Sequence, residues 1–172
     1  MRAIVLLLII AIWGFSCKKS EPECFAPRSV SAQIGFMVID TVVGVDSFNR
    51  PDTTIRIADT GLYYPTLLSL EQDTNIVFMG ERAADRLPCF LNPATPSISY
   101  VFQPNRDNAQ KDTITISYEP YEHFISNACG YTYYYNIKDV QYTRNILDSV
   151  LINDANVRSA AQQRHLIFYF ID

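Results

Sequence analysis

The chain has 172 residues, 48% of them hydrophobic and 13% aromatic, which is enough apolar material for one folded domain and too much for a disordered protein. Its formal net charge is −4, and its 14 Lys and Arg residues form no basic block. This balance excludes the electrostatic attraction to phosphates on which nucleic-acid binding depends, so no nucleic-acid partner is expected.

The first segment, residues 1–16, has the organisation of a signal peptide. Arg2 supplies a positive charge, and an unbroken run of apolar or small residues extends from Ala3 to Phe15. A membrane-spanning helix needs about 20 apolar residues, so this shorter run is more typical of a secretory signal.

The run ends in "GFSC", residues 14–17, which resembles the lipobox of bacterial lipoproteins. The resemblance implies that Cys17 becomes the first residue of the mature chain and carries acyl groups, with residues 17–23 as the lipidated cysteine and a tether. Several acyl chains on one residue anchor a protein stably. We therefore expect a bacterial envelope protein whose partner is the membrane, most simply the outer membrane. An ordinary signal peptide, cut so that Cys17 keeps a free thiol, is the alternative.

Residues 24–172 have the pattern of a single β-rich domain. Short runs of β-branched and aromatic residues alternate with Pro, Gly, Asn and Asp, as in strands joined by turns. The expected strands are residues 29–38, 41–45, 53–57, 63–70, 75–79, 87–91, 97–103, 113–118, 131–142, 148–152 and 165–171. Residues 80–86 could form one helical turn, and residues 153–163 a short helix or an exposed loop.

This pattern predicts an all-β fold, an antiparallel β-sandwich of immunoglobulin-like size, with a β-barrel as the alternative. In the first strand Val30, Ala32, Ile34 and Phe36 alternate with other residues, so their side chains are expected on the core face. The last strand, "HLIFYFI", is apolar on both faces, as in a strand that is covered from both sides.

With Cys17 lipidated, three cysteines remain, which allows one disulfide and one leftover thiol in an oxidising compartment. Cys89 lies in the apolar "LPCFL", which suits a buried thiol, whereas Cys24 opens the domain and Cys129 lies in the turn-like "SNACG". We predict a Cys24–Cys129 disulfide. A zinc site is the alternative, but the cysteines lack the close spacing of zinc ligands, so no metal and no other cofactor is expected.

The sequence contains no recognisable catalytic motif. It has only two histidines, His123 and His165, and no serine elbow, HExxH helix or phosphate-binding loop. No catalytic residue is assigned, and a hydrolase is the least favoured function.

The densest aromatic stretch is "YEPYEHFISNACGYTYYYNI", residues 118–137. If residues 131–137 form a strand, Tyr133 lies on one face and Tyr134 on the other. Most of these rings are expected to fill the core. The candidate contacts for a sugar or peptide ligand are Tyr121, Tyr133 and Tyr134, because rings and hydroxyls together suit such ligands.

The stretch "FISNACGYTYYYNIKDV", together with the lipobox cysteine and "ECFAP", resembles a family of small Bacteroidota lipoproteins with a domain of unknown function. The resemblance implies a compartment and a size, and it supports Cys24 and Cys129 as a structural pair. We expect a lipid-anchored, non-catalytic module that binds an envelope protein or a glycan. The alternative is an accessory subunit that docks on an outer-membrane complex through an exposed strand edge.

Overall fold

The structure is a computed structural model that describes residues 24, 30–71, 77–79, 82–105, 107, 109–158 and 163–171. The expected signal peptide, the tether and Cys17 lie outside the described residues. Where the chain is described, its regular elements are all β-strands, and this part of the chain contains no helix that could span a bilayer.

The strands vary from two to fifteen residues in length. In chain order they are β1 (Ser31–Val45), β2 (Pro51–Asp59), β3 (Leu62–Tyr63), β4 (Thr66–Ser69), β5 (Val77–Met79), β6 (Arg82–Ala84), β7 (Arg86–Phe90), β8 (Ser97–Gln103), β9 (Asp112–Ser126), β10 (Gly130–Tyr142), β11 (Ser149–Ile152), β12 (Asn156–Val157) and β13 (Leu166–Ile171).

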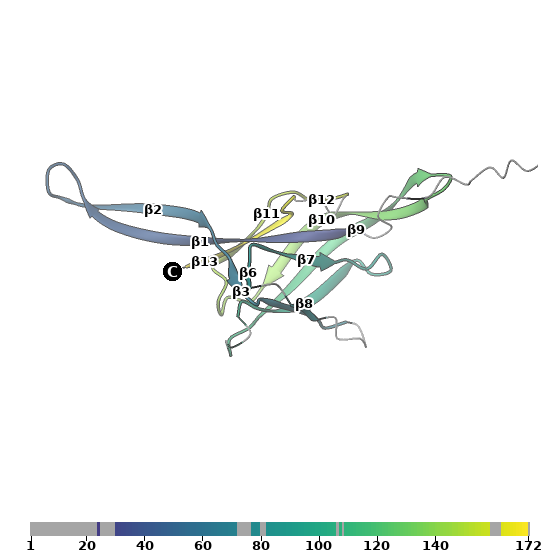
Figure 1. Cartoon of the computed structure of the whole chain (residues 1–172), viewed down its shortest axis with the longest axis horizontal. Coiled ribbons are helices and arrows are strands. Elements are labelled where there is room, and N and C mark those ends of the chain that lie inside the picture. The colour runs from purple at the N-terminus through teal and green to yellow at the C-terminus, as the bar shows by residue number, and fades with distance from the viewer. Residues whose placement is uncertain are drawn as a thin grey trace, which may run out of the picture.

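Two sheets form the body of the molecule (Figure 1). The first has the order β11-β13-β1-β2, with β7 pairing with the start of β1, and the second has the order β12-β10-β9-β8-β4-β5. Strands β3 and β6 form a separate two-stranded ladder. The predicted all-β, sandwich-like fold is confirmed, and the six-stranded sheet ends in β12 and β5 instead of closing on itself.

One strand pair departs from the antiparallel prediction. β1 and β13 run parallel, from Ile34 opposite Leu166 to Ile39 opposite Ile171. Parallel neighbours need a long connection between them, and here almost the whole domain separates the two strands. Because the local pattern of each strand is the same in either orientation, the sequence could not reveal this pairing.

Aromatic side chains from the two sheets meet in the core. The ring of Phe36 on β1 lies 6.0 Å from that of Phe102 on β8, and Phe102 lies 5.2 Å from Phe168 on β13, measured between centroids. Val30, Ala32, Ile34 and Phe36 are all buried, as their alternation predicts. The sheets therefore pack face to face, as in a sandwich.

Several local expectations need correction. The expected strand at residues 63–70 is divided between β3, which ends at Tyr63, and β4, Thr66–Ser69, because Tyr64 between them has a φ of 51°. Residues 39–40 do not interrupt the first strand, because β1 continues to Val45 and pairs with β2 up to Pro51. Residues 82–84 form β6 instead of a helical turn. Asn156–Val157 is a short strand that pairs with β10, and residues 159–162 of the expected helix or loop lie outside the described residues.

β13 is covered on both faces only over its first half. Leu166, Ile167 and Phe168 are buried, whereas Ile171 is 68% exposed at the end of the strand. The expectation that the last strand is covered from both sides therefore applies up to Phe168, and Tyr169 and Phe170 after it are only partly buried.

Candidate functional site

The predicted ligand-contact tyrosines lie in the hairpin formed by β9 and β10. In its register Tyr134 is opposite Tyr121, and Thr132 is opposite His123, so these residues share one face. Tyr133 is opposite Glu122 and therefore lies on the other face. A ligand that rests on one face of the hairpin can contact Tyr121 and Tyr134 without Tyr133, so the three candidates do not form one platform.

On the first face the aromatic rings pack against one another. The Tyr134 ring stacks on the imidazole of His123, with centroids 4.4 Å apart and an angle of 19° between the planes. Tyr121 meets Tyr134 edge-on at 5.9 Å. His123 thus has a packing role in this hairpin, and ligand contact by Tyr121 and Tyr134 stays a prediction.

On the second face the hydroxyl of Tyr133 donates a hydrogen bond to Oε1 of Glu122 at 3.1 Å. This bond, together with the negative charge of Glu122, raises the pKa of Tyr133. Beyond this pair, Phe124 and Tyr131 are opposite each other, with ring centroids 5.2 Å apart. Their side chains are 49% and 67% exposed, so the outermost pair of rings before the turn faces solvent.

The turn of this hairpin is bonded to the start of the domain. Cys24 and Cys129 form the predicted disulfide, with Cα atoms 5.0 Å apart. Gly130 has a φ of 72°, in the left-handed region that glycine adopts without strain. The backbone N–H of Cys129 donates to the hydroxyl of Ser126 at 3.1 Å, so the turn is ordered by bonds of its own.

At the opposite end of the long axis, β1 and β2 extend beyond the body as a two-stranded ribbon (Figure 1). β13 accompanies β1 only as far as Ile39. We define the arm as residues 40–56, the part of the hairpin beyond that point. Within the described residues no strand pairs with the outer edge of β2, or with the β13 side of β1 after Ile39.

The turn at the tip of the arm is fixed by Asp46. Its carboxylate accepts the backbone N–H groups of Phe48 at 2.8 Å and of Arg50 at 2.9 Å, and it pairs with the Arg50 guanidinium at 2.8 Å. The hydrogen bond from the Arg50 backbone is the largest of the effects that lower the pKa of Asp46. The guanidinium also lies over the Phe48 ring, 5.1 Å from its centroid. The arm therefore ends in a defined turn that holds its two strands in register.

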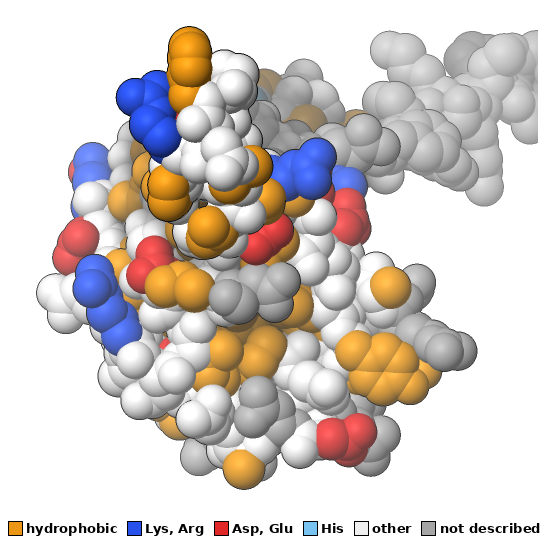
Figure 2. All heavy atoms as spheres, turned by 90° about the vertical axis from the view of Figure 1, so that its left-hand side faces the viewer, with side chains coloured by type: hydrophobic (Ala, Val, Ile, Leu, Met, Phe, Trp, Pro, Cys, Tyr) orange, Lys and Arg blue, Asp and Glu red, His pale blue; other side chains and the backbone are white. Residues whose placement is uncertain are grey.

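The two faces of the arm differ in chemistry. One face carries exposed apolar side chains, among them Val43 and Ile55, which are 72% and 67% exposed, and Val45. At its base, Ile171, Ile39 and Ile57 lie in a row across β13, β1 and β2. The other face is more polar and includes the opposed charges of Asp40 and Arg56. Figure 2, which views the molecule from this end, shows clusters of hydrophobic side chains among polar ones.

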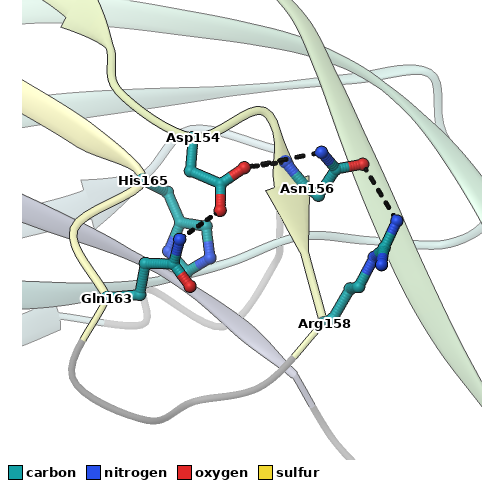
Figure 3. Close-up of a pocket in the computed structure, with 5 residues that line it drawn as sticks. All are labelled: Asp154, Asn156, Arg158, Gln163 and His165. Atoms are coloured by element: carbon teal, nitrogen blue, oxygen red, sulfur yellow. Dashed lines mark hydrogen bonds between the residues drawn. The ribbon is translucent and has the colours of Figure 1, made fainter.

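The structure also contains a polar pocket of about 230 Å³ next to β12 and the start of β13 (Figure 3). It is lined by Asp154, Asn156, Arg158, Gln163 and His165. These side chains bond to one another: Asp154 accepts from the backbone of Asn156 at 2.9 Å and from the amide of Gln163, and Arg158 donates to Asn156 at 3.5 Å. No serine or cysteine of the described residues lines it.

His165 has a structural partner at the base of this pocket. Its Nδ1 accepts the backbone N–H of Gln33 at 3.0 Å, and its own backbone N–H donates to the Gln33 carbonyl at 2.8 Å. Burial lowers the pKa of His165, against the opposing effect of Asp154, and so favours the neutral ring that can accept this bond. His165 thereby joins β1 to the chain just before β13.

Cys89 is buried in the core, as its sequence setting predicts. Burial raises the pKa of its thiol to about 12, which leaves it protonated and unreactive at neutral pH. In the described part of the chain, no three His, Cys, Asp or Glu residues lie close enough to hold a metal ion.

The arm could not be recognised as a separate feature from the sequence. Its strands have the β-branched pattern of ordinary sheet strands, and their exposure follows only from where β13 ends. The available signal was the turn-forming "DSFNRP" between two runs rich in β-branched residues. This pattern is typical of a hairpin, but it does not show whether the hairpin is buried or projects into solvent.

The sequence profile of a family of unknown function, DUF6452, matches residues 65–170. The match begins just before β4 and extends into β13, so it includes the β9–β10 hairpin, whereas β1 and β2 precede it. No curated protein matches the chain, and no solved structure does.

Proposed function

The chain belongs to DUF6452, a family of unknown function, and we propose that it is a lipid-anchored, non-catalytic assembly module of the bacterial cell envelope that docks on a protein partner through the arm. The anchor is Cys17, at the membrane that retains the protein. The observation on which the proposal depends is the exposed apolar face of the arm.

That face exposes several apolar side chains on a strand pair that stands apart from the two sheets' core. Val43, Val45 and Ile55 project from a two-stranded ribbon that has no second layer among the described residues. Two-stranded ribbons are marginally stable in water, and contiguous exposed apolar patches mark interaction sites. Burying one such side chain contributes about 1.5–3 kcal/mol, so a partner that covers the row gains substantial binding free energy.

The open edges of the arm favour a partner with an extended segment. Backbone N–H and C=O groups on the outer edge of β2 have no strand beside them in the described structure, and such edges bind added strands through main-chain hydrogen bonds. The alternating side chains of an added strand would continue the apolar row on one face. This supports a partner protein that supplies a β-strand, in agreement with the docking of an accessory subunit on an envelope complex.

Photo-crosslinking in cells tests the docking site. A photoreactive residue at Val45 should give one defined protein adduct, and the same residue at Lys138, on the exposed surface of β10, should not. Ile55→Lys should abolish the Val45 adduct because it places a charge on the apolar face. Thr54→Lys is the matched control, since Thr54 is the next residue of β2 and lies on the other face. Equal loss with both variants, or no adduct specific to the arm, would contradict the proposal.

The anchor has a separate test. Cells grown with a clickable palmitate analogue should label the wild-type protein but not Cys17→Ser, which should also leave the membrane fraction. Membrane association that is unchanged in Cys17→Ser would show that the lipid-anchor part of the proposal is wrong, whatever the arm binds.

A further inference from the structure

The disulfide fixes where a lipid anchor attaches to the folded domain. Cys24 is bonded to Cys129, which lies in the turn between β9 and β10. Cys17 precedes Cys24 by seven positions. A fully extended chain spans at most about 3.6 Å per residue, so the acylated residue is within about 25 Å of Cys24 and hence close to the hairpin turn.

The end of this hairpin is free of charge. From Phe124 to Ile137 the chain contains no Asp, Glu, Lys, Arg or His. The first ionisable side chains on β9 behind this end are His123 and Glu122, and on β10 the first is Lys138, which pairs with Glu119 at 2.9 Å. Bringing the hairpin to a membrane as far as these positions therefore buries no charged side chain of β9 or β10, and such burial is the main penalty for contact with lipid.

The same end exposes aromatic rings. Phe124 and Tyr131 form the outermost ring pair and are both exposed, and behind them Tyr133 holds Glu122 through its hydroxyl. Tyrosine is enriched at membrane interfaces, because its ring favours the apolar side and its hydroxyl the polar side. The hairpin thus has exposed aromatic rings at its end, and the next residue pair on the same face, Tyr133 and Glu122, is polar.

We propose that the end of the β9–β10 hairpin, from Phe124 to Tyr131, is a membrane-contact site that places Phe124 and Tyr131 in the headgroup region of the bilayer holding Cys17. The proposal depends on the lipid anchor of the proposed function and is independent of what the arm binds. Contact ends before Glu122, the first carboxylate that β9 carries behind the turn.

This contact orients the molecule. The hairpin tip and the arm lie at opposite ends of the long axis (Figure 1). If both the anchor and the hairpin tip hold the domain at the membrane, the arm extends away from the bilayer into the aqueous compartment, where it can bind a partner. Two attachment points also restrict tilting, which a tether alone permits.

Tryptophan fluorescence gives a direct test, because the only tryptophan of the chain, Trp13, lies in the expected signal peptide. The full lipidated protein carrying Phe124→Trp is reconstituted into vesicles of phosphatidylethanolamine and phosphatidylglycerol, with and without brominated acyl chains. We expect a blue-shifted emission that the brominated lipids quench. Val43→Trp, on the arm, is the matched control and should keep a red-shifted emission that these lipids leave unquenched.

The outcomes separate this inference from the anchor. A protein that does not float with the vesicles contradicts the lipid anchor itself. If the Phe124→Trp protein floats but its emission equals that of the arm variant, the membrane-contact site is overturned and the anchor is left intact. As a second variant, Tyr131→Lys should leave unfolding by urea unchanged and should weaken the quenching in the Phe124→Trp background; unchanged quenching would also overturn the proposal.

Discussion

The carboxylate of Asp112 accepts a hydrogen bond from the backbone N–H of Leu147 at 2.9 Å, across 35 positions of the chain. The same carboxylate accepts the N–H groups of Asn145 and Ile146 and the hydroxyl of Thr143. Asp112 is fully buried at the start of β9, so this one side chain holds the connection between β10 and β11.

Asp112→Asn should destabilise the fold at neutral pH. An amide has one acceptor oxygen where the carboxylate has two, and its NH₂ group would face backbone donors, so the loss should be about 2 kcal/mol or more. Urea unfolding at pH 7 measures it. The matched control is Asp107→Asn, because Asp107 is exposed in the loop before β9. An effect of equal size in both variants would contradict this role for Asp112.

The stabilisation by Asp112 should also depend on pH. Burial raises the pKa of Asp112, but the four hydrogen bonds it accepts outweigh burial, so the folded pKa lies below the ordinary value of 3.8. A carboxyl group whose pKa is lower in the folded state stabilises fully above the unfolded pKa and loses this effect as the pH falls through the folded pKa. The difference in unfolding free energy between wild type and Asp112→Asn should therefore shrink below about pH 4. A difference that is constant from pH 7 to pH 3 would show that ionisation is not involved.

The Cys24–Cys129 disulfide should contribute strongly to stability. It closes a loop of 105 positions. In the chain-entropy model such a loop contributes about 4–5 kcal/mol by restricting the unfolded chain. Urea unfolding of the oxidised protein and of the Cys24→Ser/Cys129→Ser variant measures the difference, and a reducing agent should destabilise only the oxidised protein. A midpoint that reduction leaves unchanged would contradict the prediction.

Gly35 should not tolerate a side chain while Arg164 keeps its position. A Cβ at Gly35 would clash with Cδ of Arg164, whose guanidinium bonds to Asp59 and lies 3.8 Å from Asp85. Gly35→Ala should therefore destabilise the protein by about 1–3 kcal/mol, the usual range for overpacking. In an Arg164→Ala background the same substitution should have a much smaller effect. A double-mutant cycle in urea tests this, and additive effects would mean that the clash with Arg164 is not the cause.

Thiol titration should count a single reactive cysteine, and only after unfolding. Burial raises the pKa of Cys89 to about 12, so the folded protein should not react with a thiol reagent at pH 8. In denaturant without reductant, Cys89 should give one equivalent if Cys17 is lipidated and Cys24 is bonded to Cys129. Two equivalents would mean that Cys17 is free, and rapid reaction of the folded protein would mean that Cys89 is accessible.

The sequence predicts the placement of side chains best where an apolar face of a strand is covered by the core. Val30, Ala32, Ile34 and Phe36 face the core as their spacing predicts, because one face of β1 is covered along that stretch. Beyond Ile39 the same strand continues with similar residues but no longer has β13 beside it. The local residue pattern of β1 indicates a strand, but it does not indicate how far its neighbour β13 extends beside it.

For the candidate site, the sequence showed which residues are aromatic, but it did not show which of their rings are buried and which are exposed. The aromatic content of the β9–β10 hairpin is visible in the sequence, and alternation already separates Tyr133 from Tyr134. Whether a ring fills the core or faces solvent depends on its distance from the second sheet: Tyr135 is buried, whereas Tyr131, four positions closer to the turn, projects beyond it.

Strand periodicity and the setting of each cysteine are local properties, so they were enough to predict an all-β chain, a Cys24–Cys129 disulfide and a buried thiol at Cys89. Three features became visible only in the fold: β1 and β13 run parallel, the arm extends beyond the body after Ile39, and the disulfide lies at the charge-free end of a hairpin. These features depend on which distant segments become neighbours, and that pairing is stabilised by packing across the whole domain.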